Sequence, residues 1–294
     1  MNLEKPADNY LDYKEHFQLA DRWILSRLQR TIEAVGGNLD KFRINDSLSA
    51  VYHFFWHEFC DWYLELIKPR LSAEAAPEER ETVRAIAVHV MKVSMSLLHP
   101  YVPFITEEIW NRLKAKDEPS LVIAPWPQVQ ESLVNAQDEE EMRFVQEVIG
   151  AVRNIRSEMN VPPGRQATVK FKCDNPERVE IISRNQHYIK HLARLTEITP
   201  IDRQGNVPSA AMAVVEDVEI YVPLEGLIDI EVEKQRLSKE IERLEKQIGG
   251  LEKKLSNQQF LEKAPRRVVQ QEQEKLQNFR QKLEKLQNNL SQLK

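Results

Sequence analysis

Apolar residues recur every three or four positions over the first hundred residues of the chain, a spacing typical of amphipathic helices. The first stripe covers residues 19–35 and is followed by Gly36-Gly37, a residue type that commonly ends a helix with a positive φ. A second stripe, rich in aromatic residues, starts near Asp40 and reaches Leu66. Its width predicts that more than one neighbouring helix covers it, so this second helix should be central.

A third and a fourth helix are separated by a proline corner. Pro77 and the acids after it are favourable in a first turn, and the stripe that follows ends at His99-Pro100. We expect Pro100 and Pro103 to end the third helix and to aim the short fourth helix back across the others. Four such helices predict an antiparallel bundle, followed by an extended connector to about residue 137. Three apolar residues of the short helix are expected in the core: Phe104, Ile109 and Trp110.

The period changes after residue 137. A helix over 138–160 ends at "VPPG", and the segments beyond it alternate between apolar and polar residues, as half-buried strands do. The expected strands are "ATVKFKC", "EITPID", "AMAVVED" and "VEIYVPL", with the helical segment "NPERVEIISRNQHYIKHLARL" after the first of them. This order predicts a small α+β unit, with a mostly antiparallel sheet of three or four strands and helices on one face.

The last 66 residues carry two heptad seams, in which apolar residues keep spacings of three and four. The turn-like segment "SNQQFLEKAP" separates them, so the two helices most simply fold back as an antiparallel hairpin, each ~40 Å long at 1.5 Å per residue. A dimerising coiled coil would show the same seams and stays an alternative. The seam positions are Leu237, Ile241, Leu244, Ile248, Leu251 and Leu255, then Leu276, Phe279, Leu283, Leu286, Leu290 and Leu293.

The sequence therefore predicts a mainly α protein: an antiparallel helical bundle, then a small α+β unit, then a two-helix coiled-coil hairpin. The expected domain boundaries are 1–137, 138–228 and 229–294.

Composition and charge narrow the function classes. The 294 residues are 41% hydrophobic and 30% charged with only 8 glycines, which leaves little material for the glycine loops that hold nucleotides. Neither an apolar run of membrane-spanning length nor a secretion signal is found, and two distant cysteines suit a reducing, cytoplasmic compartment. The formal net charge is −5, yet residues 229–294 carry a net +4. That mild bias permits an anionic partner for the hairpin.

No catalytic or metal site is expected. His53 and His57 share a helical face in "HFFWHE", but the HExxH order and a third ligand are missing, so we interpret them as bundle histidines. The adjacent pair Glu107-Glu108 diverges by ~100° on a helix, which fits first-turn acids better than a shared catalytic site. Glycine-rich and nucleophile motifs are also missing, so we expect neither catalysis nor a cofactor in this segment.

Arginines beside aromatic residues are the remaining candidates for chemistry. Arg residues one turn apart can hold successive phosphates, and unpaired RNA bases stack on aromatic and guanidinium planes. Solvated helix surface is the equally simple alternative. In the hairpin, further arginines lie on faces that the seams do not use. The candidates are Arg22, Trp23, Arg27, Arg30, Arg153 and Arg156, with Arg236, Arg243, Arg266, Arg267 and Arg280 of the hairpin.

Five segments of the chain, in order, resemble one protein family. They are "LADRWILSRL", "FFWHEFCDWYLELIKPRL", "LLHPYVPFITEEIW", "VRNIRSEMNVPPG" and "FLEKAPRRVVQQEQEKL". Together they resemble the C-terminal part of bacterial valyl-tRNA synthetases, class I enzymes, over essentially the whole chain. The bundle and corner are also similar to those of the isoleucine and leucine enzymes, whereas "SEMNVPPG" and "FLEKAP" favour valine.

The resemblance implies a tRNA-binding module. In that family the bundle binds the anticodon, and the terminal hairpin is an arm on the outer corner of the tRNA. The HIGH and KMSKS signatures that bind ATP, and the editing domain, have no counterpart here, so we expect the segment to be inactive alone. It is then either a cut piece or the product of a truncated gene. The expected partner is valine tRNA, with no membrane partner and with the chain as a monomer.

Two alternatives to this interpretation stay open. A stand-alone coiled-coil adaptor would use the hairpin to bind proteins, with the bundle as a platform. The same module from an isoleucine enzyme would keep the function and change the tRNA. Salt separates the first alternative from RNA binding, because counterion release makes RNA binding weaken steeply with added salt.

Overall fold

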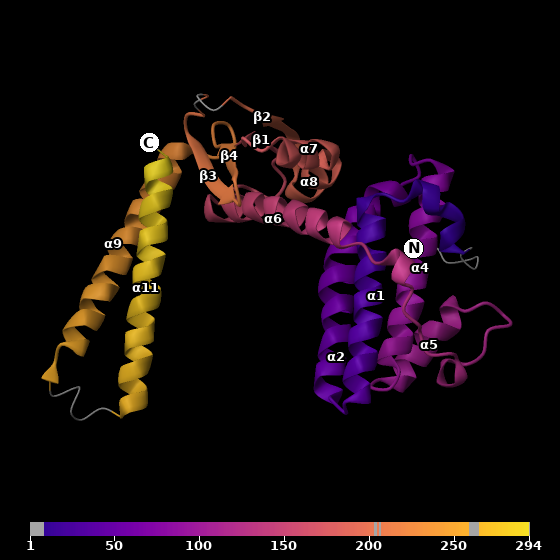
Figure 1. Cartoon of the computed structure of the whole chain (residues 1–294). Helices are drawn as coiled ribbons and strands as arrows, with labels where there is room; N and C mark the ends of the chain where they lie inside the picture. Colours follow the sequence, from indigo (N-terminus) through magenta and orange to yellow (C-terminus); the bar gives the residue numbers. More distant parts are fainter. Residues whose placement is uncertain (1–8, 203–204, 206, 259–264, 294) are drawn as a thin grey trace. The chain divides into compact units, whose positions relative to one another are not determined.

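The computed structural model describes residues 9–202, 205, 207–258 and 265–293. The chain divides into two compact units, Met1–Phe144 and Val145–Lys294, and each is described by itself (Figure 1). The finer division of the second unit at residue 228 stays a prediction. None of the helices in the described ranges is long and apolar enough to cross a membrane.

The first unit is built of helices around one core. Leu28, Val51 and Ile86, from three different helices, are fully buried in it. The elements are η1 (Tyr10–His16), α1 (Leu19–Asp40), α2 (Ile44–His53), η2 (Phe54–Tyr63), α3 (Leu64–Ile67), η3 (Lys68–Leu71), α4 (Pro77–Leu98), α5 (Pro103–Leu113), η4 (Leu121–Ile123) and η5 (Glu131–Leu133), and α6 (Ala136–Glu158) begins here. The mainly α bundle predicted from the apolar stripes is thereby confirmed.

Two helix ends differ from the prediction. Helix α1 does not stop at Gly36-Gly37 but continues to Asp40, and the next helix begins at Ile44. The chain turns at Phe42, which takes the left-handed conformation with a φ of +58°. Backbone N–H groups of the turn donate to carbonyls of the last helical turn, so the helix is ended without glycine.

The central helix of the first unit changes its winding. Residues Phe54–Tyr63 form a π-helix, in which the wider i→i+5 turn replaces the α-helical one. The apolar spacing in the sequence predicted helix here without indicating this change. Phe54, Phe59 and Tyr63 of the segment are fully buried, so its aromatic side chains fill the core as expected.

The proline corner confirms one part of its prediction and corrects another. Trp110 is buried with Met95 and Leu121, and its indole N–H donates to the carbonyl of Pro119 over 3.0 Å. Ile109 packs partly against the same cluster. The prediction that Phe104 lies in the core is wrong, because its side chain is 91% exposed. It lies two residues before buried Thr106, and two steps of about 100° point it to the opposite side of α5.

A buried ion pair joins three elements of the first unit. Arg70 Nη1 lies 2.5 Å from Asp21 Oδ2, and the two side chains are 7% and 0% exposed. The Tyr63 hydroxyl donates to the other carboxylate oxygen over 3.0 Å, and Arg70 also donates to the carbonyl of His16. Because each charge is satisfied by the other and by hydrogen bonds, this network ties the start of α1 to η2 and η3.

His89 on α4 should make the stability of the first unit depend on pH. The centroid of its ring lies 4.1 Å from that of Tyr10, with the ring planes tilted by 33°. Burial, with Lys92 nearby, lowers the pKa of His89 to about 4. The unfolded chain therefore takes up the proton first as pH falls from about 6.5 to 4. We expect the free energy of unfolding to drop over this window by up to about 3 kcal/mol more in the native chain than in His89→Gln. Urea unfolding of both chains at pH 4, 5, 6 and 7 measures this; equal pH profiles would contradict it.

The second unit contains a four-stranded sheet in the order β2-β1-β4-β3. The pair β1–β2 is parallel and the other two pairs are antiparallel, so the predicted mostly antiparallel sheet is confirmed. Burial alternates along β1 and β4, so one face of the sheet is covered and the other is exposed or half-buried. The elements are β1 (Ala167–Lys172), α7 (Pro176–Arg184), α8 (Gln186–Ala193), β2 (Leu195–Pro200), β3 (Ala210–Val215) and β4 (Val218–Pro223).

The predicted hairpin is confirmed within the second unit. Helices α9 (Ile230–Leu255) and α11 (Arg266–Gln292) lie along each other (Figure 1), and the turn segment at 259–264 is outside the described residues. Leu237, Leu244 and Leu286 of the two seams are buried between the helices. Three ion pairs also link the helices in antiparallel order: Lys254–Glu272, Arg280–Glu252 and Lys282–Glu240.

Candidate nucleic-acid interface

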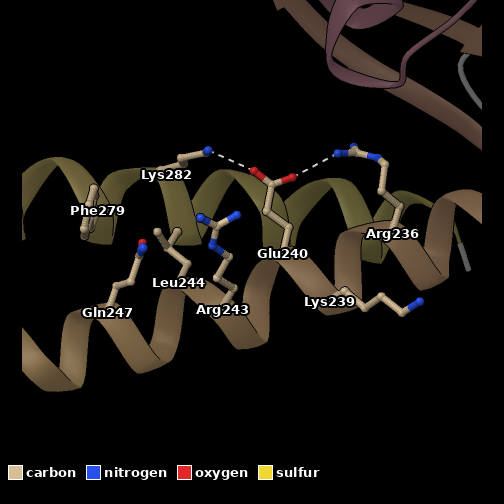
Figure 2. A pocket seen from close by; sticks show the side chains of 8 residues that line it. All are labelled: Arg236, Lys239, Glu240, Arg243, Leu244, Gln247, Phe279 and Lys282. Atoms are coloured by element: carbon tan, nitrogen blue, oxygen red, sulfur yellow. Dashed lines mark hydrogen bonds and ion pairs between the residues drawn. The ribbon is translucent and has the colours of Figure 1, made fainter.

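A groove runs along one side of the hairpin, with a volume of ≈ 460 Å³ (Figure 2). Its floor is apolar, because Leu244 and Phe279 come from the two heptad seams. The residues that line it are Arg236, Lys239, Glu240, Arg243, Leu244 and Gln247 of α9 with Phe279 and Lys282 of α11. Four of these eight residues are cationic and one is acidic.

Glu240, the single carboxylate among these eight residues, forms ion pairs with two of the four cations. Glu240 lies 2.9 Å from Arg236 Nη1 and 2.8 Å from Lys282 Nζ, and these contacts come from opposite sides (Figure 2). The hydrogen bond from Lys282, aided by Arg236, holds the pKa of Glu240 below its ordinary value. Arg236 also binds Glu233 over 2.6 Å, which raises the pKa of the guanidinium. The formal charges of these four side chains, two cations and two carboxylates, therefore cancel.

The other two cations, Lys239 and Arg243, are not bound by Glu240. Arg243 directs its guanidinium from α9 toward α11 beside Leu244, while Lys239 extends along α9 away from Glu240 (Figure 2). Within the described residues, neither side chain has an ion pair or hydrogen bond. A guanidinium presents several N–H donors in a plane that matches a phosphate, and an ammonium adds a point charge. The groove can therefore hold an anionic group at Arg243, with Lys239 at its rim.

The remaining hairpin candidates do not line this groove. Arg280 pairs with Glu252 on α9 over 2.6 Å and contributes to the hairpin itself. Arg266 and Arg267 are exposed at the first turn of α11, beside the undescribed segment. Of the five hairpin arginines expected from the sequence, the structure brings Arg236 and Arg243 together.

The bundle arginines bind acids of their own unit. Arg22 donates two hydrogen bonds to the carboxylate of Asp138, each over 3.0 Å. Arg27 binds Glu58 in the same bidentate manner, at 2.7 and 3.0 Å, and this hydrogen bonding raises the pKa of its guanidinium. Arg30 lies 3.4 Å from Glu139, a carboxylate that also contacts Arg27. Together these pairs fasten the start of α6 and the π-helix to α1.

Packing and hydrogen bonds within the protein hold Trp23 and the two arginines of α6. Trp23 is buried in the core, so its ring offers no open face on which a base could stack. Arg153 donates to the carbonyl of Leu192 over 2.9 Å, and Arg156 donates to that of Arg165 over 2.7 Å. Burial lowers the pKa of Arg156, which is itself buried. Whether the exposed parts of these bundle and α6 arginines touch RNA stays a prediction.

Comparison with known proteins decides the family. Residues 21–171, half of the chain, match the family model described as the anticodon-binding domain of tRNA ligase. Residues 229–294, the hairpin, match the model described as the valyl tRNA synthetase tRNA binding arm. The chain belongs to the valyl-tRNA synthetase family. Its two matched segments are the anticodon-binding and arm domains of that family.

The curated relatives are longer than this chain. The valine–tRNA ligase of Geobacillus kaustophilus is 39% identical over 296 residues, which cover all of this chain and 33% of the relative. That of Thermotoga maritima is 39% identical with 32% covered, and that of Anoxybacillus flavithermus 40% with 33% covered. The chain therefore spans about a third of the length of the valyl-tRNA synthetases that it matches.

The groove lies wholly within the segment matched by the valyl-tRNA synthetase arm model. Sequence reasoning found Arg236 and Arg243 but missed Lys239, Gln247 and Lys282 as lining residues. The signal was available: Lys239 and Arg243 are four apart on one face of α9, and Lys282 flanks the facing seam. What the sequence could not indicate is that Glu240 pairs with Arg236 and Lys282, while Arg243 has no ion-pair partner among the described residues.

The histidine pair weighed as a metal site has acidic neighbours on its own helix. His53 Nδ1 lies 3.4 Å from Glu58, and His57 Nδ1 lies 3.2 Å from Asp61. Across the described part of the chain, the structure contains no group of three or more His, Cys, Asp or Glu side chains that could hold a metal ion.

Proposed function

We propose that this chain binds valine tRNA as the C-terminal module of a valine–tRNA ligase. The helical unit binds the anticodon limb, and the hairpin binds the tRNA body through phosphates in the groove. The observation that carries the proposal is the groove itself: two uncompensated cations over an apolar floor, inside the segment that matches the arm model. The family membership supports valine as the amino acid that the tRNA accepts. The parent ligase joins valine to that tRNA with ATP, a reaction for which this segment has no motif.

The proposed monomer follows from the same hairpin. Leu237 and Leu244 of one seam and Leu286 of the other are already buried within one chain, so no second chain is needed to cover them. The acids and bases that flank the seams also pair across the hairpin, as at Lys254 and Glu272.

Changing both unpaired cations of the groove tests the proposal. We expect Lys239→Ala with Arg243→Ala to weaken binding of valine tRNA roughly tenfold at low salt and to lower the log–log salt slope by about 2, since two phosphate contacts are lost. Filter binding at several salt concentrations measures both quantities. The control is Lys246→Ala with Lys285→Ala, which removes two exposed hairpin cations outside the groove. Equal salt slopes for the two double variants would show that the groove does not contact the tRNA.

A further inference from the structure

The groove of the hairpin contains more than the binding of phosphates requires. Besides its cations, it is lined by the aromatic ring of Phe279 on α11 and by the amide of Gln247 on α9. Phosphates are bound by cations and N–H donors and do not require an aromatic ring. The groove volume of ≈ 460 Å³ also falls within the range of about 300–1,000 Å³ that is typical of ligand pockets. The lining therefore suits a ligand that has a flat ring as well as a charge.

The ring of Phe279 is incompletely covered by the facing helix. Phe279 stands at a seam position but is only half-buried, whereas Leu244 of the facing seam is 5% exposed. Helix α9 has no side chain at Gly249-Gly250, where an added Cβ would meet nothing within 4 Å. The ion pair between Arg280 and Glu252 places this bare stretch of α9 near Phe279. Part of the ring is therefore accessible to a ligand.

One neighbour of the ring is a cation of its own helix. The ammonium of Lys275 lies 5.7 Å from the centroid of the Phe279 ring, within the range of a cation–π contact. Lys275 is exposed and does not line the groove. An exposed contact of this kind is weaker than the stacking of a nucleobase on an aromatic ring. Lys275 therefore does not prevent a base from stacking on Phe279.

Two polar side chains of α9 are directed toward the same helix as the ring. Arg243 and Gln247 lie four residues apart, and both extend from α9 toward α11 (Figure 2). Within the residues that the structure describes, neither forms an ion pair or a hydrogen bond. An amide offers donors and an acceptor together, which match the mixed edge of a nucleobase. A base stacked on Phe279 would thus have an amide beside its edge and a guanidinium near its phosphate.

We propose that the hairpin groove takes one unpaired nucleobase of the tRNA together with its phosphate. The base stacks on Phe279 and presents its Watson–Crick edge to Gln247, while Arg243 binds the phosphate with Lys239 at the rim. Unpaired bases of RNA loops are the ones that can leave the stack and bind aromatic side chains in this way. The inference rests on the proposed binding of valine tRNA by the hairpin and adds a contact to a base.

Chemical modification of valine tRNA, bound by the full chain at saturating concentration, tests the inference. Dimethyl sulfate, kethoxal and a carbodiimide together modify the free Watson–Crick edges of all four bases. We expect one unpaired base outside the anticodon loop to react at least tenfold more slowly in the complex than in free tRNA. In complexes with Phe279→Leu or with Gln247→Ala, that base should react as fast as in free tRNA. Gln281→Ala, which changes an exposed glutamine of α11 outside the groove, is the control and should keep the protection.

Affinity gives a second readout that the loss of a cation would not imitate. Phe279→Leu should weaken the binding of valine tRNA about fivefold or more and leave the log–log salt slope unchanged, because a stacked base releases no counterions. Leucine fills other positions of both seams, so the hairpin should keep its melting temperature within a few degrees. Phe279→Tyr retains an aromatic ring and should bind as the native chain does.

The outcomes separate this inference from the proposed function. If Lys239→Ala with Arg243→Ala lowers the salt slope but no base is protected by the native chain, the groove binds phosphates alone and the base contact is wrong. Equal losses of affinity in Phe279→Leu and Phe279→Tyr would likewise show that the ring only fills the seam. If Phe279→Leu lowers the melting temperature, Gln247→Ala decides, because its side chain is exposed and should lose the base protection without unfolding the hairpin. A native chain that does not bind valine tRNA would contradict both proposals.

Discussion

Replacing Arg70 with Ala should lower the free energy of unfolding of the helical unit by about 3–5 kcal/mol, one of the largest single-residue effects expected in this chain. The loss comes from Asp21, whose carboxyl group would be left in a fully buried position without its ion-pair partner. The Tyr63 hydroxyl and the backbone N–H of Gln18 would still donate to that carboxylate, but two neutral donors do not compensate for the missing guanidinium. Urea unfolding followed by circular dichroism measures the change.

Two comparisons make this prediction specific to the buried pair. Arg112→Ala removes an exposed arginine that pairs with Glu108 on α5, and it should cost at most about 0.5 kcal/mol. Asp21→Asn combined with Arg70→Met should cost less than the sum of the two single changes, because no unpaired charge is left behind. A loss below about 1 kcal/mol for Arg70→Ala would show that the pair is not needed to hold η3 on α1.

Opening the hairpin should have the largest effect on tRNA binding. Deleting residues 229–294 removes the groove with both of its cations, so it should weaken the binding of valine tRNA by more than the roughly tenfold loss expected of the groove variant, while the first unit, with its own core, still folds. Leu244→Asp with Leu283→Asp should mimic the deletion, since two charges in the facing seams separate the helices. Gly249-Gly250 inside α9 costs about 2 kcal/mol relative to alanines, so the hairpin has little stability to spare.

The matched control places the same charges where the seams are not touched. Gln271→Asp with Gln281→Asp adds two exposed acids to α11 and should bind almost as the native chain does. Filter binding and sedimentation of all four proteins give the answer. Equal affinity of the deletion and the full chain would show that the hairpin is not a tRNA clamp. A native dimer that the deletion abolishes would favour the coiled-coil adaptor instead.

Most of the fold could be predicted because the local spacing of apolar residues determines which elements form. The 4-3 spacing of the hairpin leucines and the alternation in "ATVKFKC" specify which face of each element is buried. The predictions that failed concern the end of α1 and the position of Phe104. Phe42 turns the chain in a conformation that Gly36-Gly37 was expected to supply, and Phe104 falls on the far side of a helix whose start differs from the prediction by one turn or less.

The candidate site was harder to predict because ion pairs join residues far apart in the sequence. Arg22 and Asp138 are 116 positions apart, and Arg27 and Glu139 are 112 apart. An arginine flank on an amphipathic helix looks the same whether it faces solvent, a phosphate or such an acid. In the hairpin the decisive fact is likewise a pairing: Glu240 binds Arg236 and Lys282, and Arg243 is left without an ion pair within the part of the hairpin that the structure describes.

The most direct measurement of the central claim is phosphate-ethylation interference on valine tRNA with the full chain and with the Lys239→Ala, Arg243→Ala variant. The account predicts two clusters of interfering phosphates for the full chain, one in the anticodon limb and one at the outer corner of the tRNA. The groove variant should lose the corner cluster and keep the anticodon cluster. No interference at either place, or a corner cluster that survives in the variant, would contradict the account.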